Sequence, residues 1–332
     1  MTTTTRPHAP ALPSARGPLS HGVIRALHTG HVPDPGLRAL AAGAEPYGDD
    51  LHLALYVLYE LHYRGFAGVA DDREWDADLL DVRRALEDRF LAALRRDVPG
   101  PRDPAEVLAE LLVEPADTSG SVSHHLRRHG DLDTFREYAA LRSLYHLKEA
   151  DPHAWVLPRL DGRAKAAMAA IEYDEFGAGR ADQVHARLFA DLMADLGLDP
   201  SYGRYLDRAP APMLAVVNVM SLFGLHRALR GALVGHFAWV EVTSSPGSRR
   251  LASGLRRAGA GPAAQRFYDE HVEADAVHEQ VVRHQVVEGL LAAEPDLAAD
   301  VAFGADATTF LEDRFAEHLL AAWRSGRSAL RC

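Results

Sequence analysis

Hydrophobic positions recur at helical spacing along most of the chain. In residues 49–66, Leu51, Leu55, Leu58 and Tyr59 fall in one helical phase and therefore share one face of a helix. No stretch shows the alternation expected of a half-buried strand. The same spacing predicts further helices over residues 37–42, 75–96, 132–150, 161–175, 181–196, 240–255, 262–293 and 308–324, with one more opening at Asp103. The mostly apolar residues 210–237 are expected to form either one long helix or a buried pair of turns. The pattern therefore predicts an all-α helical bundle.

Composition along the chain suggests how this bundle is organised. The first residues are rich in Thr, Pro, Ala and Gly, and we expect residues 1–45 to form a flexible N-terminal arm. Residues 46–332 are expected to form a single helical domain, with accessory helices over residues 46–125 and the main bundle over residues 130–324. The Ser244-Ser-Pro246-Gly sequence predicts a helix break, because proline removes a backbone donor.

Charge and cysteine content narrow the function classes. The 332 residues include 36 Lys and Arg against 47 Asp and Glu, for a formal charge of -11. This balance argues against general nucleic-acid binding and provides no polybasic membrane patch. No run of 18 apolar residues or secretory leader is apparent, so we expect a cytoplasmic protein without membrane contact. The single cysteine, Cys332, excludes an intramolecular disulfide, and any metal would be held by His, Asp and Glu, which suits iron or manganese.

One predicted helix carries three such residues on a single face. His271, Asp275 and His278 occupy positions i, i+4 and i+7. At about 1.5 Å per residue the two histidines lie about 10 Å apart, too far for one ion but compatible with two ions about 3.5–4 Å apart. The alternative is a solvated helix face, because histidine is abundant in this chain and the helix is very polar. The spacing favours a non-haem iron site.

A second candidate pair interrupts the helical pattern. Glu175 and His185 are ten residues apart, which on one straight helix would separate them by about 15 Å. Gly177 and Gly179 lie between them and allow the chain to turn, so that both side chains can reach one site. The alternative interpretation of Gly-x-Gly is an ordinary helix end.

Two further carboxylates are candidates, each with a competing interpretation. Glu241 follows a strongly apolar approach and is expected to face inward, with His236 competing in the same turn. Glu149 precedes Pro152 and could equally be a solvent-exposed residue. Glu60 and His62 form a rival pair, but residues two apart on a helix point to different faces.

Together these residues resemble the ligand pattern of the haem-oxygenase-like di-iron oxidases and oxygenases, a family of helical bundles without haem. The family order is Glu, then Glu ten residues before His, then Glu, then His-x-x-x-Asp-x-x-His. The resemblance covers about residues 130–290, including the phrase Glu-Phe-Gly-x-Gly-Arg at 175–180. It implies a metal-binding bundle preceded by additional N-terminal helices, with the metal ligands Glu149, Glu175, His185, Glu241, His271, Asp275 and His278.

The resemblance also implies an activity. Two Fe(2+) ions would activate O2, with an external electron donor where the reaction requires one. The substrate would be a small amino acid or amine, and N-oxygenation in specialised metabolism is the first expectation. Oxidative C–C cleavage or desaturation of an amino acid or fatty acid is the alternative from the same site, and a non-catalytic helical binding module is the alternative of another class. By family a homodimer is allowed, and the helix around His271–His278 is expected to become ordered only with metal.

Overall fold

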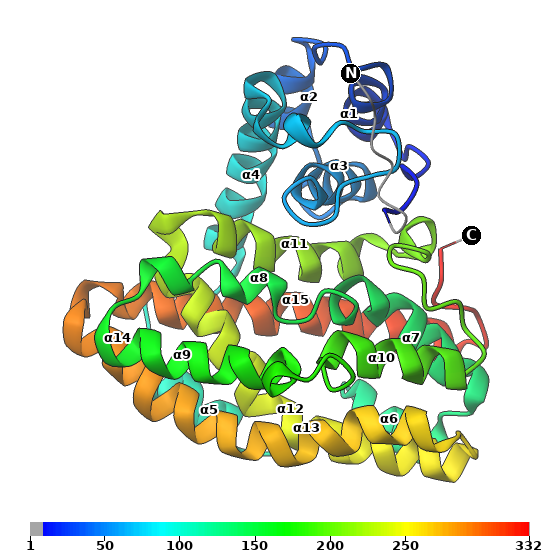
Figure 1. The fold of residues 1–332 in the computed structure, drawn as a ribbon, viewed down its shortest axis with the longest axis vertical. Coiled ribbons are helices and arrows are strands. Elements are labelled where there is room, and N and C mark those ends of the chain that lie inside the picture. Colours follow the sequence, from blue (N-terminus) through cyan, green and yellow to red (C-terminus); the bar gives the residue numbers. More distant parts are fainter. Residues whose placement is uncertain (1–8, 332) are drawn as a thin grey trace.

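The computed structural model describes residues 9–331, and within them every regular element is a helix. The predicted all-α fold is therefore confirmed. Figure 1 shows a smaller group of N-terminal helices stacked on a larger bundle, with α11 lying directly beneath α3. The first group comprises α1 (Pro18–Thr29), α2 (Leu37–Gly43), α3 (Asp49–Glu60) and α4 (Ala77–Asp97), with a 3₁₀ turn at Asp71–Trp75.

The rest of the chain forms the larger bundle. Two short helices, α5 (Pro104–Leu111) and α6 (Val122–His129), pack against the long helices α12 and α15. The remaining helices are α7 (Leu132–His146), α8 (Asp151–Ala154), α9 (Gly162–Glu175), α10 (His185–Asp195), α11 (Ala211–Leu225), α12 (Arg230–Ala258), α13 (Pro262–Val281), α14 (Glu288–Ala293) and α15 (Ala298–Arg324). A π-helical turn, Val282–Val287, joins α13 to α14, so the predicted long helix over residues 262–293 is continuous. Short 3₁₀ turns occur at Leu157–Arg159, Gly177–Gly179, Leu206–Arg208, Arg227–Leu229 and Pro295–Leu297.

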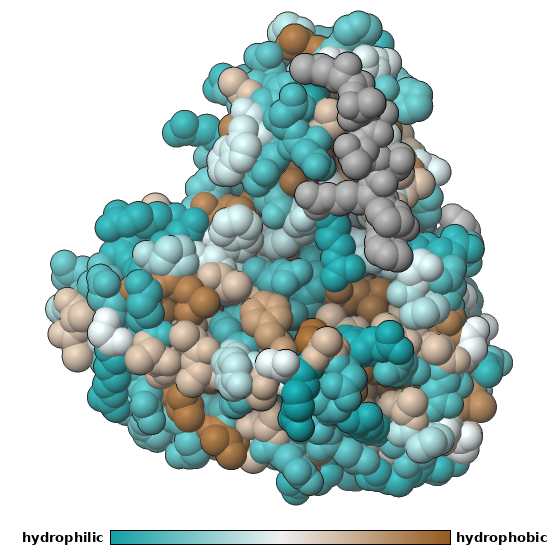
Figure 2. All heavy atoms as spheres, viewed as in Figure 1, coloured by the Kyte–Doolittle hydropathy of each residue, from teal (hydrophilic) through white to brown (hydrophobic). Residues whose placement is uncertain are grey.

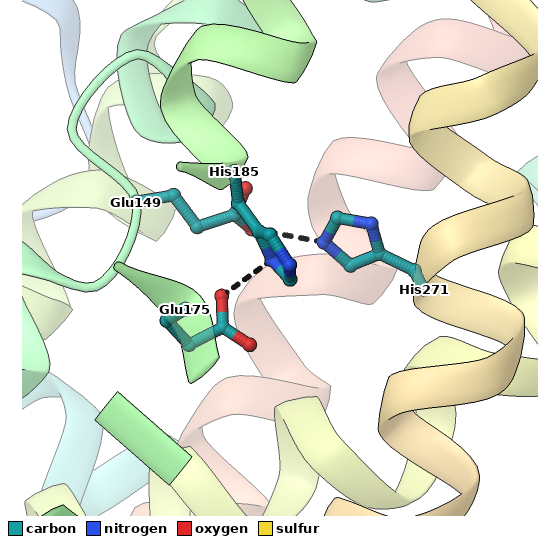
Figure 3. Close-up of side chains that lie close together, drawn as sticks. All are labelled: Glu149, Glu175, His185 and His271. Atoms are coloured by element: carbon teal, nitrogen blue, oxygen red, sulfur yellow. Dashed lines mark ion pairs between the residues drawn. The ribbon is translucent and has the colours of Figure 1, made fainter. Parts of the chain in front are cut away.

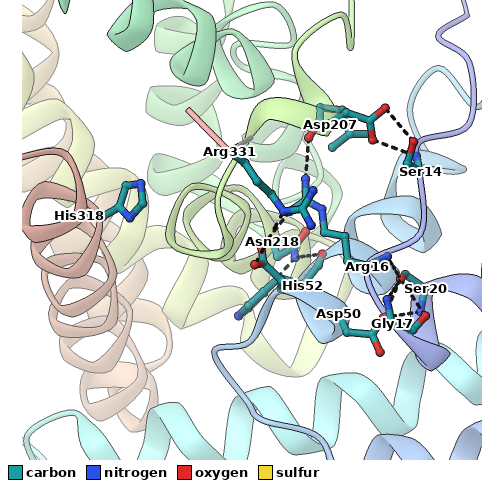
Figure 4. A network of polar contacts seen from close by, with 12 residues as sticks. Ser14, Arg16, Gly17, Ser20, Asp50, His52, Asp207, Asn218, His318 and Arg331 are labelled. Carbon is teal, nitrogen blue, oxygen red and sulfur yellow. Dashed lines mark hydrogen bonds and ion pairs between the residues drawn. The ribbon is translucent and has the colours of Figure 1, made fainter. Parts of the chain in front are cut away.

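The expectation of a flexible arm over residues 1–45 is wrong for residues 9–45. Leu19, Val23 and Leu27 recur every four residues along α1 and are buried against the core. Asp50 accepts hydrogen bonds from the amides of Leu19 and Ser20 at the start of that helix, as Figure 4 shows for part of the network. The apolar period and this contact order a segment whose composition looked flexible, while residues 1–8 of the predicted arm lie outside the described residues.

Polar contacts also fasten the segment before α1 to the bundle. Arg16 donates to the carbonyl of Leu206 at 2.8 Å and pairs with Asp49 at 3.0 Å. The amide of Ser14 donates to Asp207 at 2.8 Å, one of the contacts drawn in Figure 4. The N-terminal helices therefore pack as part of the folded body.

The sequence placed one break in the wrong position. Helix α12 runs without interruption through Pro246, whereas the chain bends by 108° between α11 and α12 near Leu225. Helix α12 packs along α13 and α15, and the hydroxyl of Ser245 donates to the carbonyl of Val272 on α13. These tertiary contacts retain a helix that loses one backbone donor at the proline.

Helices α12 and α15 cross at very short range because both carry glycine at the crossing. A Cβ atom at Gly235 would lie 1.8 Å from the carbonyl oxygen of Val301, and one at Gly304 would lie 1.9 Å from the carbonyl oxygen of Ala232. No larger residue fits at either position without separating the helices.

No single helix in residues 9–331 has the length and apolar character to cross a membrane, and only the bent α11–α12 pair reaches that threshold when combined. Figure 2 shows a face on which hydrophilic residues predominate over the N-terminal helices, with small hydrophobic patches scattered over the bundle.

Candidate metal centre

Five segments far apart in the chain bring the predicted ligands into the middle of the bundle. The turn after α7, the end of α9, the start of α10, and the middles of α12 and α13 each contribute. None of the seven side chains is more than 6% exposed: they are Glu149, Glu175, His185, Glu241, His271, Asp275 and His278. The solvated-face interpretation of α13 is therefore wrong, and so is the exposed interpretation of Glu149.

The glycines between Glu175 and His185 reverse the chain as predicted. Gly177, Ala178 and Gly179 have φ values of 77°, 51° and 81°, in the left-handed region that favours glycine. A Cβ at Gly177 would lie 2.7 Å from the amide nitrogen of Val184, so the backbone segments before and after the reversal are in contact. As a result Glu175 Oε2 lies 2.7 Å from His185 Nδ1.

A first group of four ligand atoms gathers at this reversal. Glu149, Glu175, His185 and His271 each offer one atom, and these atoms all lie within 4.8 Å of one another. Figure 3 shows His271 reaching from α13 toward the carboxylates and imidazole on the opposite side. Glu149 Oε1 lies 3.8 Å from His271 Nε2 and also accepts from His146 Nδ1 at 2.8 Å.

A second group lies one turn further along α13. Glu175, Asp275 and His278 offer atoms that again lie within 4.8 Å of one another. Glu241 adjoins this group, with its Oε2 3.3 Å from His278 Nδ1. Glu175 thus belongs to both groups, and Asp275 is grouped with His278.

The two histidines of α13 are oriented by contacts on their outer nitrogens. Nδ1 of His271 lies 2.7 Å from the carbonyl of Phe267, which leaves Nε2 facing Glu149. Nε2 of His278 lies 3.4 Å from Asp174, which leaves Nδ1 facing Glu175 and Glu241. A carbonyl or carboxylate behind an imidazole is the usual support of a metal-binding histidine.

Several inward-facing atoms make no hydrogen bond of good geometry and contact only other ligand atoms. These buried polar atoms are Glu149 Oε2, His185 Nδ1, Glu241 Oε2, His271 Nε2, Asp275 Oδ2 and His278 Nδ1. Buried polar groups are rarely left unpaired, since each costs about 1–3 kcal/mol. Divalent cations would satisfy all six, and the donor set of imidazole and carboxylate suits iron.

The shifted pKa values of the metal-free ligand residues also indicate that the cluster favours positive charge. Burial opposes an imidazolium, yet Asp275 and Glu149 outweigh it and raise the pKa of His271 to about 10. Burial likewise opposes the charge of His278, but the adjacent carboxylates of Asp275 and Glu241 raise its pKa to about 11. Burial, with Asp275 and Glu175 adding repulsion, raises the pKa of Glu241 to about 8. Protons occupy positions that metal ions would take.

The rival residues serve other purposes. Glu60 is fully buried in an ion pair with Lys148, and His62 lies 2.9 Å from Glu74. Nδ1 of His236 lies 2.8 Å from the hydroxyl of Thr308, away from the ligand groups. In the part of the chain that the structure describes, clusters of three or more His, Asp or Glu at metal-binding distance occur only at the two groups above.

Sequence reasoning missed the residues around the centre. Asp174 behind His278 and His146 behind Glu149 contribute outer contacts, and Glu172 is buried with both carboxylate oxygens unpartnered. Burial, with Glu175 and Glu241 adding repulsion, raises the pKa of Glu172 to about 9. Glu172 and Asp174 lie three residues and one residue before Glu175 in the sequence, but only the folded arrangement shows that they adjoin the site.

A cavity of about 780 Å³ connects this centre to the surface. Its inner wall includes ligand residues and the buried His153 and His236, and its outer wall includes residues 110–115 and 120–124 of the α5–α6 segment. Trp239 and Tyr268 are among the aromatic residues that line it. The cavity gives a small molecule a path to the ligand groups.

Comparison with known proteins agrees with this geometry. The profile of the iron-containing redox enzyme family, which is haem-oxygenase-like, matches residues 136–313, a stretch that contains every candidate ligand. No curated protein matches the chain. The match spans more than half of the chain, from within α7 to within α15. The chain therefore belongs to the iron-containing redox enzyme family and is an iron-dependent oxidoreductase with an all-α, haem-oxygenase-like fold.

Proposed function

We propose that this protein is an O2-dependent di-iron oxygenase that adds oxygen to the nitrogen of a small amine. The observation that carries the proposal is that Glu175 belongs to two adjacent ligand groups. A carboxylate shared in this way can bridge two ions about 3.5–4 Å apart. One ion would be held by Glu149, His185 and His271, and the other by Glu241, Asp275 and His278.

The charge of the ligand set supports two divalent ions. Four carboxylates contribute a charge of -4, three neutral imidazoles contribute none, and two Fe(2+) ions contribute +4. A buried site of this charge is costly without cations. When bound, a pair of iron(II) ions supplies the electrons and the Lewis acidity that O2 activation requires.

The remaining groups of the chain orient ligands and control access. The carbonyl of Phe267 and the carboxylate of Asp174 hold the imidazoles of His271 and His278 in position. Phe267 and Phe189 pack edge to face beside His271, and Phe267 also lines the cavity. The cavity then limits the substrate to a small molecule that enters beside α5 and α6.

The cavity favours an amine over an amino acid carboxylate. Its two arginines are already paired: Arg142 binds both oxygens of Glu312 at 2.7 and 2.6 Å, and Arg250 binds Glu114 at 3.0 Å. In contrast, His153 Nε2 and His236 Nε2 have no partner. Burial lowers the pKa of His153 to about 4, so its imidazole is neutral. The hydroxyl of Thr308 donates to the carbonyl of Gly304 and so accepts from Nδ1 of His236, which leaves Nε2 of His236 as an acceptor. Unpaired acceptors without a free guanidinium suit a substrate that brings N–H donors.

Anaerobic reconstitution with iron(II) tests the metal assignment. Two iron ions per chain are expected for the wild type, and His271→Ala should bind at most one. His284→Ala is the matched control, because His284 lies on the same long helix but is exposed and pairs with Glu288. Fewer than one iron per wild-type chain, or haem binding with no effect of Glu175→Ala, would instead support a non-catalytic binding module.

The reaction is tested by supplying O2 and candidate primary amines to the iron-loaded protein. N-oxygenation would convert RNH2, O2, two electrons and two protons into a hydroxylamine and water, which adds the mass of one oxygen atom to the amine. The two Fe(2+) ions supply the electrons for one turnover, and an added reductant supplies them for further turnovers. Desaturation would remove two hydrogen atoms, and C–C cleavage would give two fragments, so mass spectrometry of the product separates the three outcomes. Consumption of fatty acids but not amines would contradict the amine proposal.

A further inference from the structure

A buried ion pair joins the N-terminal helices to the segment that carries Glu149. Lys148 Nζ lies 3.0 Å from Glu60 Oε2, and both side chains are at most 2% exposed. The hydroxyl of Tyr202 donates to the other oxygen of Glu60 at 2.7 Å. The ammonium group also lies 4.3 Å from the ring centre of Tyr63. All the strong contacts of Lys148 are therefore made away from the metal centre, while its neighbour Glu149 faces it.

Glu149 requires such support because it alone among the candidate ligands lies outside a helix. It belongs to the turn between α7 and α8, followed by Ala150 with a φ of 71°. The amides of Lys148, Glu149 and Asp151 make only turn-type bonds within the segment. A second anchor comes from Arg64, which donates to the carbonyl of Leu147 at 2.9 Å. Helical hydrogen bonding cannot hold Glu149 in place, but the contacts from α3 and the turn after it can.

The energetics of buried ion pairs indicate that the Glu60–Lys148 pair positions the Glu149 segment rather than adding stability. Removing two charges from water costs about as much as their attraction returns, so such pairs contribute little net stability. They do require one defined geometry, and a ligand held within about 0.5 Å is what a metal site needs.

We propose that Glu60 is a positioning residue that acts through Lys148 to hold Glu149 at the first ligand group. This inference rests on the proposed di-iron function, since it requires Glu149 to be a ligand. It gives the N-terminal helices a role in the chemistry of a centre to which they contribute no ligand. Sequence reasoning considered Glu60 only as a rival ligand beside His62, and the structure assigns it to the support of a ligand instead.

The double variant Glu60→Gln/Lys148→Met tests this role in the full-length protein. It removes both charges while keeping the volumes, so the fold is expected to persist. Iron per chain should fall from two to one, as in Glu149→Gln. Hydrogen exchange of the amides of residues 147–151 in the metal-free protein should accelerate at least about tenfold. The control is Asn218→Leu, which removes the buried 2.8 Å hydrogen bond from Asn218 to His52 between α11 and α3 without touching the segment; it should retain two irons.

Each outcome decides between the alternatives. Two irons and unchanged exchange in the double variant would overturn the positioning role, as would an equal loss of iron in Asn218→Leu. If the double variant does not fold, Tyr202→Phe decides, because it removes one hydrogen bond from Glu60 and keeps the ion pair; exchange at residues 147–151 should still rise about threefold. If the wild type binds no iron, the proposed function fails, and exchange that stays slow in the double variant would show separately that Glu60 does not hold the segment.

Discussion

One oxygen of Glu175 lies 2.7 Å from His185 Nδ1, and its other oxygen lies 3.6 Å from His278 Nδ1. The single carboxylate therefore connects the reversal between α9 and α10 with the middle of α13. Removing it should affect both ligand groups at once. We expect Glu175→Gln to retain less than one iron per chain, whereas Asp275→Asn should retain about one, measured after anaerobic reconstitution.

The control for that comparison is Asp174→Asn, next to Glu175 in sequence but in contact only with the outer nitrogen of His278. Losing such a supporting contact typically weakens metal affinity about 10–100-fold without removing a ligand. Equal iron loss in Glu175→Gln and Asp275→Asn would show that Glu175 serves only one ion.

The candidate site was predictable because its signals are local in sequence. The i, i+4, i+7 spacing of His271, Asp275 and His278 places them on one face of α13. The glycines after Glu175 predict the chain reversal that brings His185 back to Glu175. How the pieces meet was not predictable, because spacing on one element gives no distance to another. That Glu175 joins both groups appears only once α9 and α13 are packed together.

The errors in the predicted fold also arise because local sequence does not report contacts between elements. Proline at position 246 predicts a break, but contacts of α12 with α13 and α15 override this local preference. Composition marked residues 1–45 as flexible, although the four-residue period of Leu19, Val23 and Leu27 was present. The Glu60–Lys148 pair joins residues 88 positions apart, and no periodicity reports such a contact.

The crossing of α12 and α15 should tolerate no side chain at Gly235. Gly235→Ala places a Cβ 1.8 Å from the backbone oxygen of Val301, so the helices must separate. We expect a loss of about 3 kcal/mol or more in the free energy of unfolding, measured by urea denaturation. Gly247→Ala on the same helix is the control: nothing lies within 4 Å of the added atom, so stability should rise by about 0.5–1 kcal/mol. Equal effects of the two substitutions would contradict the close crossing.

Stability should decrease in mild acid because of His52. Burial lowers the pKa of this fully enclosed imidazole to about 3, whereas in the unfolded chain it titrates near 6.5. The unfolded state therefore binds a proton that the folded state cannot, and stability falls as pH decreases from about 6.5 toward 3. Between pH 6.5 and 5 the loss is about 2 kcal/mol at most.

His52→Gln isolates this contribution, since it keeps a polar group near Asn218 and has no titration in this range. The slope of unfolding free energy against pH, measured by urea denaturation of the metal-free protein between pH 5 and 7, should be smaller in the variant. An identical slope in both proteins would assign the acid sensitivity to other groups.

Metal binding should order α13 more than any other helix. In the metal-free protein His271, Asp275 and His278 have inward-facing atoms without hydrogen-bond partners, and Glu241 is held partly protonated among them. Cations that bind only the folded arrangement add about 2.7 kcal/mol of stability at a hundredfold excess over the dissociation constant. We expect hydrogen exchange across residues 267–281 to slow at least about tenfold on addition of iron(II), with little change in α1–α4. Manganese(II), which accepts the same ligands without O2 chemistry, should give the same protection, and its absence with both metals would show that α13 does not depend on the centre.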